Sequence, residues 1–171
     1  GLYFKDEPIY QKAKGLLLRE LEEQLLPDGA HYEQSPMYHC ILLDRLLDCY
    51  NVSVNNLRFI GQEGLNERLR EKASGMLGHL ASVVYKDNPI PLLNDSAEGI
   101  APSPAQLFAY AKRLDMDWEK LPMGACGYRK LMAGHWEAIV DVGDIRASYQ
   151  PGHSHADTFN YELRIGGKPF V

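Results

Sequence analysis

One short stretch of the chain, residues 31–39, carries a high density of side chains that can move protons. It reads His-Tyr-Glu-Gln-Ser-Pro-Met-Tyr-His, so histidine, glutamate and tyrosine lie close together in sequence. Ser35 followed by Pro36 predicts a helix N-cap and first helical residue, which puts Tyr38 in the first turn. Unpaired backbone N–H groups and the helix dipole favour negative charge there. Tyr38 is therefore a candidate for acid–base chemistry, although it and His39 could also be ordinary helix residues.

A second chemically suggestive stretch is Pro-Gly-His-Ser-His-Ala-Asp at residues 151–157. In an extended segment, His153 and His155 point to the same side, and Asp157 continues that parity. Imidazole suits Zn²⁺, with Asp157 as an oxygen ligand or as a partner that orients one. A polar loop before a strand is the alternative. A cupin strand also carries His-x-His, but its glutamate follows three or four residues later, whereas Glu162 lies further on.

The elements that hold these stretches differ between the two halves of the chain. After Pro122, apolar residues recur at every second position. This alternation predicts strands over 136–142 and 159–165, and Gly166-Gly167 predicts a turn after the second strand. Before that point, apolar residues recur at helical spacing. They predict helices over about 7–26, 36–50, 62–85 and 103–114. Helices first and strands second is the segregated α+β pattern, not alternating βαβ.

Composition limits the classes of partner. The 171 residues carry a net charge of −5 without any Lys/Arg block, which argues against a nucleic-acid-binding protein. No apolar run reaches transmembrane length and no signal peptide is visible, so no membrane partner is expected. A local cluster of arginine and histidine could still bind an anionic substrate. The three cysteines form no metal-type Cys-x-x-Cys pair and are expected as free buried thiols: Cys40, Cys49 and Cys126.

Three other side chains have weaker interpretations. Arg45 lies seven residues after Tyr38, two turns along the same helix face, where it could contact a substrate carboxylate. A solvated surface charge is the alternative for Arg45. His79 and His135 are expected to be core or surface residues.

The two motifs together resemble the heparinase II/III family of polysaccharide lyases. Residues 28–39, followed by a leucine-rich helix, are similar to the toroid segment of that family. Residues 151–157, then Phe-Asn-Tyr-Glu-Leu at 159–163 and Gly-Gly-Lys at 166–168, are similar to the start of its C-terminal β-sandwich. The resemblance spans nearly the whole chain, and two motifs in the right order make it specific.

The resemblance implies a fold and an activity. The expected fold is a helical (α/α) toroid segment over 1–118 followed by an antiparallel β-sandwich-type segment over 119–171, with a substrate cleft between them. The expected activity is β-elimination on an anionic, uronic-acid-containing polysaccharide. Because family members are mostly bacterial and often exported, a periplasmic or secreted location is expected.

The resemblance also implies residue roles. Tyr38 matches the catalytic tyrosine and His153 the histidine supplied by the sandwich, while His155 matches a residue that in some members binds a structural zinc. Other residues would line the cleft and bind substrate: His31, Glu33 and His39. The group that neutralises the substrate carboxylate would precede Gly1 and later zinc ligands would follow Val171, so we expect an excerpt of a longer protein. The alternative function is a non-catalytic carbohydrate-binding or scaffold module of the same fold, and a metal-dependent hydrolase is a third hypothesis.

Overall fold

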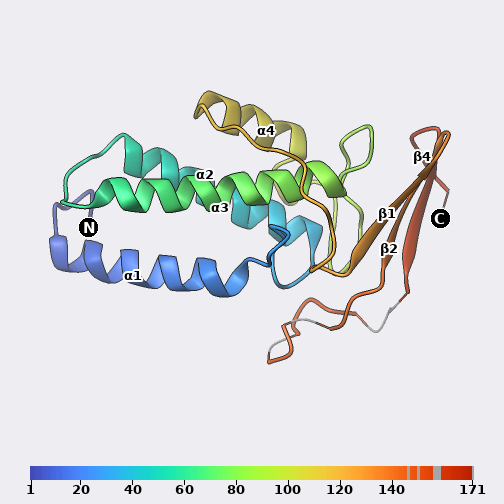
Figure 1. Cartoon of the computed structure of the whole chain (residues 1–171), viewed down its shortest axis with the longest axis horizontal. Coiled ribbons are helices and arrows are strands. Elements are labelled where there is room, and N and C mark those ends of the chain that lie inside the picture. The colour runs from blue at the N-terminus through green and yellow to red at the C-terminus, as the bar shows by residue number, and fades with distance from the viewer. Residues whose placement is uncertain (146, 150, 156–158, 171) are drawn as a thin grey trace.

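The structure is a computed structural model, and it describes residues 1–145, 147–149, 151–155 and 159–170. Four helices precede four strands (Figure 1), which confirms the α+β prediction. The helices are α1 (Glu7–Gln24), α2 (Pro36–Val54), α3 (Gln62–Val83) and α4 (Pro104–Arg113). The strands are β1 (Tyr128–Ala133), β2 (Trp136–Asp141), β3 (Tyr161–Ile165) and β4 (Lys168–Pro169).

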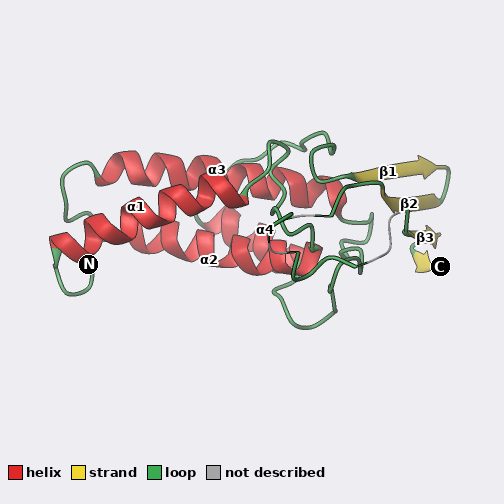
Figure 2. Ribbon diagram, turned by 90° about the horizontal axis from the view of Figure 1, so that it is seen from below, coloured by secondary structure: helices red, strands yellow, loops and turns green. Residues whose placement is uncertain are grey.

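The helices pack lengthwise, and the sheet lies at one end of them (Figures 1 and 2). α1 runs toward the sheet, α2 returns, and α3 runs toward the sheet again (Figure 1). Leucines and a methionine at helical spacing fill the space between α2 and α3, and all are fully buried: Leu43, Leu47, Leu69, Met76 and Leu80. This arrangement puts the turn between α1 and α2, which carries His31–His39, at the end of the helices nearest the sheet.

Side-chain caps mark the starts of two helices. The hydroxyl of Ser35 accepts the backbone N–H of Tyr38 at 3.4 Å, with Pro36 as the first residue of α2. At α4, Ser103 and Gln106 form the reciprocal capping box. Tyr38 therefore lies in the first turn of α2, as its spacing from Ser35 predicts.

The strands form one antiparallel sheet in the order β1-β2-β3-β4. The two-residue turn Gly134-His135 joins β1 to β2, and Gly166-Gly167, both with positive φ, joins β3 to β4. β1 was not among the predicted strands. Its apolar residues Leu131, Met132 and Ala133 are consecutive rather than alternating, and all three are exposed, so no period-two pattern marks it.

A buried polar network joins the helical part to the sheet. The Asn94 amide donates to the carbonyl oxygen of Gln34 (3.3 Å), to the hydroxyl of Tyr128 (3.0 Å) and to the carboxylate of Asp141 (3.3 Å). The Gln34 amide in turn donates to the carbonyl oxygen of Cys126 at 2.9 Å. Gln34 and Asn94 both have positive φ, at 59° and 50°. The network therefore compensates for two unfavourable backbone conformations.

The three cysteines form no disulfide bond. The cysteines are free, as predicted, but only Cys40 and Cys126 are buried, whereas Cys49 is exposed. The prediction that Cys49 is buried was wrong, because it lies outside the apolar stripe of α2. Among the described residues, no helix has the length and apolar character needed to cross a membrane.

Because of this network, removal of the Asn94 amide alone should lower the stability of the protein strongly. Asn94→Ala should lower the free energy of unfolding by about 2–4 kcal/mol, because it leaves buried acceptors unpaired and puts alanine at positive φ. Chemical denaturation of the full-length protein measures the change. Asn55→Ala removes an exposed amide that donates to Asn51 and serves as the control, with an expected loss under about 1 kcal/mol. Equal losses in the two variants would contradict the role given to the network.

Candidate active site

Tyr38 and His153 come together in the folded chain although they lie on different parts of it. Their rings stack with centroids 4.0 Å apart and planes inclined by 28°. Tyr38 comes from the first turn of α2, and His153 from the loop between β2 and β3. Tyr38 is half-buried and 29% of the His153 side chain is exposed, so both remain accessible to a ligand. A phenol and an imidazole in contact can exchange protons with a bound molecule.

Two carboxylates flank the His153 ring, one at each nitrogen. Nδ1 lies 3.2 Å from Oδ2 of Asp95, and Nε2 lies 3.6 Å from Oε2 of Glu33. Because a carboxylate accepts hydrogen bonds, the Asp95 contact indicates that Nδ1 carries the proton and donates it. Asp95 therefore fixes the tautomer and the orientation of the ring that stacks on Tyr38.

Asp95 also binds the second histidine of the motif. Nε2 of His155 lies 2.5 Å from Oδ1 of Asp95, and the His155 backbone N–H donates to Oδ1 of Asn94 at 3.4 Å. Hydrogen bonds from His155 and His153 hold the pKa of Asp95 below its ordinary value. Asp95 is consequently a carboxylate at neutral pH. Asp157, the other predicted zinc ligand, lies outside the described residues, so the predicted zinc site at His155 stays a prediction.

His31 lies behind Glu33 and is 7% exposed. Its Nδ1 is 3.9 Å from Oε2 of Glu33, the same oxygen that faces His153. Burial, assisted by the positive charge that His153 can carry, lowers the pKa of His31 to about 4. His31 is thus a neutral imidazole that lies beside Glu33 on the buried side.

The prediction that His39 lines the cleft is corrected by its environment. The side chain is 3% exposed and both ring nitrogens are used. Nδ1 accepts the backbone N–H of His31 at 3.2 Å, so Nε2 donates to the carbonyl oxygen of Met76 at 3.0 Å. Burial lowers the pKa of His39 well below its ordinary value. His39 is a neutral residue that fastens the 31–39 segment to α3.

Arg45 is not part of the cluster either. Seven residues at 1.5 Å per residue put it about 10 Å further along α2 than Tyr38. Its guanidinium pairs with Asp48 at 3.4 Å and with Asp44 at 3.7 Å, and its side chain is 71% exposed. The solvated-charge interpretation fits these contacts, and the contact with a substrate carboxylate stays a prediction.

Sequence reasoning identified Tyr38, His153 and Glu33 but gave no role to Asp95. Asn94 and Asp95 are consecutive residues with positive φ, and Ser96 docks the same loop on α2 by accepting the backbone N–H of Met37 at 3.1 Å. Asparagine and aspartate tolerate this conformation better than most residues. An Asn-Asp pair between two predicted helices is the one available signal, and it indicates a turn rather than a site.

Two family models match the chain and together cover nearly all of it. The model described as heparinase II/III N-terminus matches residues 5–117, and the model described as heparinase II/III-like, C-terminal matches residues 115–171. The chain belongs to the heparinase II/III family. No curated protein matches it significantly.

Solved lyase structures of this family share the fold. Heparan sulfate lyase HepC from Pedobacter heparinus superposes with a TM-score of 0.67 at 20% identity, over 95% of this chain and 28% of its own. A heparinase III gene product with methylated lysines gives 0.60 at 18% identity, over 96% and 28%. A further heparinase III gives 0.58 at 19% identity, over 92% and 29%. The chain thus spans less than a third of the length of these relatives.

The low pKa of His31 predicts a pH-dependent stability. Between the ordinary histidine pKa of 6.5 and about 4, the unfolded chain binds a proton that the folded chain does not bind. Folding stability is therefore complete above about pH 6.5 and falls as the pH drops toward 4, by about 3 kcal/mol from His31 alone. Unfolding measured by denaturant across this range, in wild type and in His31→Gln, checks the effect. A variant that loses stability as steeply as wild type would contradict it.

Proposed function

We propose that the full-length protein is a polysaccharide lyase that cleaves uronic-acid-containing polysaccharides by β-elimination, with Tyr38 and His153 as its acid–base groups. The observation that carries the proposal is the stacked contact between these two rings, 4.0 Å apart, in a member of the heparinase II/III family. The similarity in fold to a heparan sulfate lyase supports the same reaction class.

The reaction sets three chemical demands. A base must remove the proton from the carbon next to the uronate carboxylate, which is a very weak carbon acid. Negative charge then develops on that carboxylate and must be stabilised by positioned donors or cations. Finally, an acid must protonate the glycosidic oxygen as the bond to the neighbouring carbon breaks.

Tyr38 can meet the first and third demands in turn. As a phenolate it takes the carbon-bound proton, and as the resulting phenol it gives a proton to the leaving oxygen. His153 stacks on Tyr38 and is held by Asp95, so its ring stays next to the phenol. Glu33 completes the environment of His153 from the opposite edge of the ring. In this mechanism Asp95 and Glu33 position the imidazole and do not touch the substrate.

Heparan sulfate is the first polymer to test because a similar structure is described as a heparan sulfate lyase. An exported location and a structural zinc at His155 complete the proposal. The partner is an anionic polysaccharide.

Removing the Tyr38 hydroxyl tests the acid–base assignment. Tyr38→Phe should lower kcat by about 10²–10⁴-fold, because the base and acid are lost while the ring remains stacked on His153. The measurement is the near-ultraviolet absorbance of the unsaturated uronate product, recorded with the full-length protein and heparan sulfate.

Tyr110→Phe is the matched control for this experiment. It removes another half-buried phenol, which donates to Asp48, ten residues after Tyr38 on α2, and should leave kcat unchanged. Unsaturated product formed at the wild-type rate by Tyr38→Phe would overturn the assignment. Saturated products from wild type would instead indicate a hydrolase, and binding without any product would indicate the non-catalytic module.

A second variant tests the positioning of His153. Asp95→Asn keeps the shape of the side chain but removes the charge that orients both histidines, and we expect kcat to fall by about 10–100-fold with little change in KM. The pH dependence of kcat should shift as well, which a purely structural defect would not cause. Glu98→Gln, an exposed change a few residues along the same loop, is the control. An unchanged pH profile in Asp95→Asn would contradict the positioning role.

A further inference from the structure

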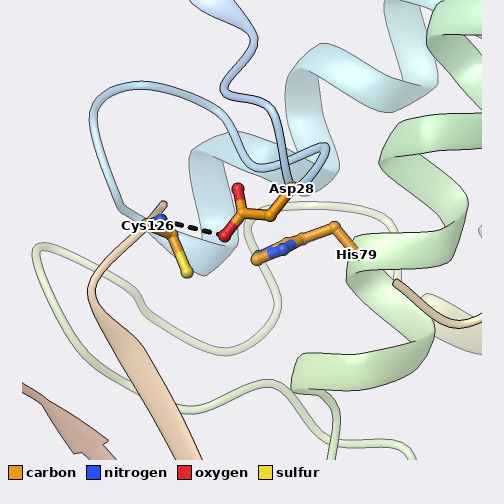
Figure 3. A group of neighbouring side chains, drawn as sticks. All are labelled: Asp28, His79 and Cys126. Atoms are coloured by element: carbon orange, nitrogen blue, oxygen red, sulfur yellow. Dashed lines mark hydrogen bonds between the residues drawn. The ribbon is translucent and has the colours of Figure 1, made fainter. Parts of the chain in front are cut away.

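A second cluster of reactive side chains lies inside the molecule, apart from Tyr38 and His153. Asp28, His79 and Cys126 are all buried, and one donor atom from each lies within 4.8 Å of the others. They come from the turn after α1, from α3 and from the segment that enters β1, and Figure 3 shows them converging. The cluster combines one oxygen, one nitrogen and one sulfur donor.

Cys126 lies in a tight backbone turn. Its sulfur accepts the backbone N–H of Tyr128, two residues further on, at 3.4 Å. Gly127 between them has a φ of +84°, and a Cβ there would collide with the backbone of Gly143. Hydrogen bonds of this kind stabilise negative charge on sulfur.

The Asp28 carboxylate also accepts hydrogen bonds from backbone N–H groups. One carboxylate oxygen accepts the backbone N–H groups of Gly124 (3.1 Å) and Cys126 (2.9 Å), the latter drawn as the dashed line in Figure 3. Burial alone would raise the pKa of Asp28, but these hydrogen bonds outweigh it and lower the pKa. Asp28 therefore stays ionised, and its other oxygen accepts the Ala30 N–H at 3.4 Å.

Two further observations indicate that this cluster can bind an ion or a small molecule. Nδ1 of His79 is buried and has no hydrogen-bond partner among the described residues, although the side chain is only 4% exposed. A small cavity of about 10 Å³ is lined by His79 and Cys126, together with His31 and His39. That volume is about the size of one water molecule or one ion. An orphaned imidazole nitrogen next to such a void is unusual, because buried polar atoms normally find a partner.

We propose that Asp28, His79 and Cys126 bind a zinc ion. Borderline-soft Zn²⁺ accepts this mixture of oxygen, nitrogen and sulfur donors, whereas Mg²⁺ and Ca²⁺ prefer oxygen alone. In a tetrahedral zinc site, donors lie roughly 3.3–3.6 Å apart, so the three side chains need to close by about 1 Å. The fourth position is taken by a water molecule, for which the neighbouring void has room.

The charges of the three groups suit the ion. Burial lowers the pKa of His79, so its imidazole is neutral and able to coordinate. Burial and the Asp28 carboxylate raise the pKa of the Cys126 thiol to about 12, so the metal-free thiol is protonated. On binding, a Zn–S bond replaces the S–H bond and the proton leaves to solvent. One dication then meets two anionic ligands, and the buried site becomes neutral.

Such a site would join three segments that the chain brings together from distant positions. The turn at Asp28 already lies tightly on α3, since a Cβ on Gly29 would collide with the carbonyl oxygen of Gly75. The same turn leads into His31–His39, so the zinc would stabilise the segment that carries Tyr38. This site is independent of the zinc predicted at His155, which uses no thiolate.

The test measures metal in the full-length protein. Cys126→Ala should contain about one zinc ion per chain less than wild type, and Cys40→Ala should contain as much as wild type. Cys40→Ala is the matched control because it removes another fully buried thiol, which lies on α2. His155→Ala separates the two sites, because any zinc it loses is additional to the zinc lost by Cys126→Ala. Activity is not the readout, so failure of the lyase proposal leaves this test intact.

Cobalt substitution gives a second measurement that does not depend on a variant folding. Co²⁺ bound through Cys126 in wild type should give the near-ultraviolet sulfur-to-metal charge-transfer absorption, which Asp–His coordination alone cannot produce. Added Zn²⁺ should displace it. Absence of that absorption in wild type, or equal zinc content in Cys126→Ala and Cys40→Ala, would overturn the proposal.

Discussion

The hydrogen bonds of one buried amide, Asn94, set the geometry on which the candidate active site depends. This side chain reaches the segment before α2 through Gln34, the first strand through Tyr128 and the second through Asp141. Such contacts are strong in a low-dielectric interior only when every partner is present. The network thus favours one relative position of the helices and the sheet over neighbouring ones.

The position of His153 follows from that constraint. Asp95 is the next residue after Asn94, so fixing the amide also fixes the carboxylate that holds both histidines of the loop between β2 and β3. On the other side, Gln34 directly precedes the cap of α2, whose first turn carries Tyr38. Tyr38 lies four residues after Gln34, and His153 is bound by Asp95, the residue after Asn94, so the network positions both partners of the stacked pair.

The parts of this structure that sequence could predict are those set by local chemistry. Ser35-Pro36 and Ser103-Pro104 mark helix starts by hydrogen bonds within one turn, and the parity of His153 and His155 correctly predicts that they reach a common partner. Asp95 could not be predicted, because its role depends on a loop brought beside them by tertiary contacts. His39 has the residue type of a site but the burial of a core residue, and Asp28, His79 and Cys126 share no local spacing. Strand β1 has no alternation because most of its side chains are exposed on both faces.

The charges around Tyr38 are compatible with the anionic polymer proposed as substrate, although two acidic residues lie in the site. Glu33 and Asp95 would repel a uronate if they faced it unpaired. Each instead faces a nitrogen of His153, and Asp95 binds His155 as well, so their charge is directed to the imidazoles. In the proposed reaction, the His153 ring is thereby held beside the negative charge that passes through Tyr38 during proton transfer. The buried side of the same cluster is closed by His31, which stays neutral and so does not compete for Glu33.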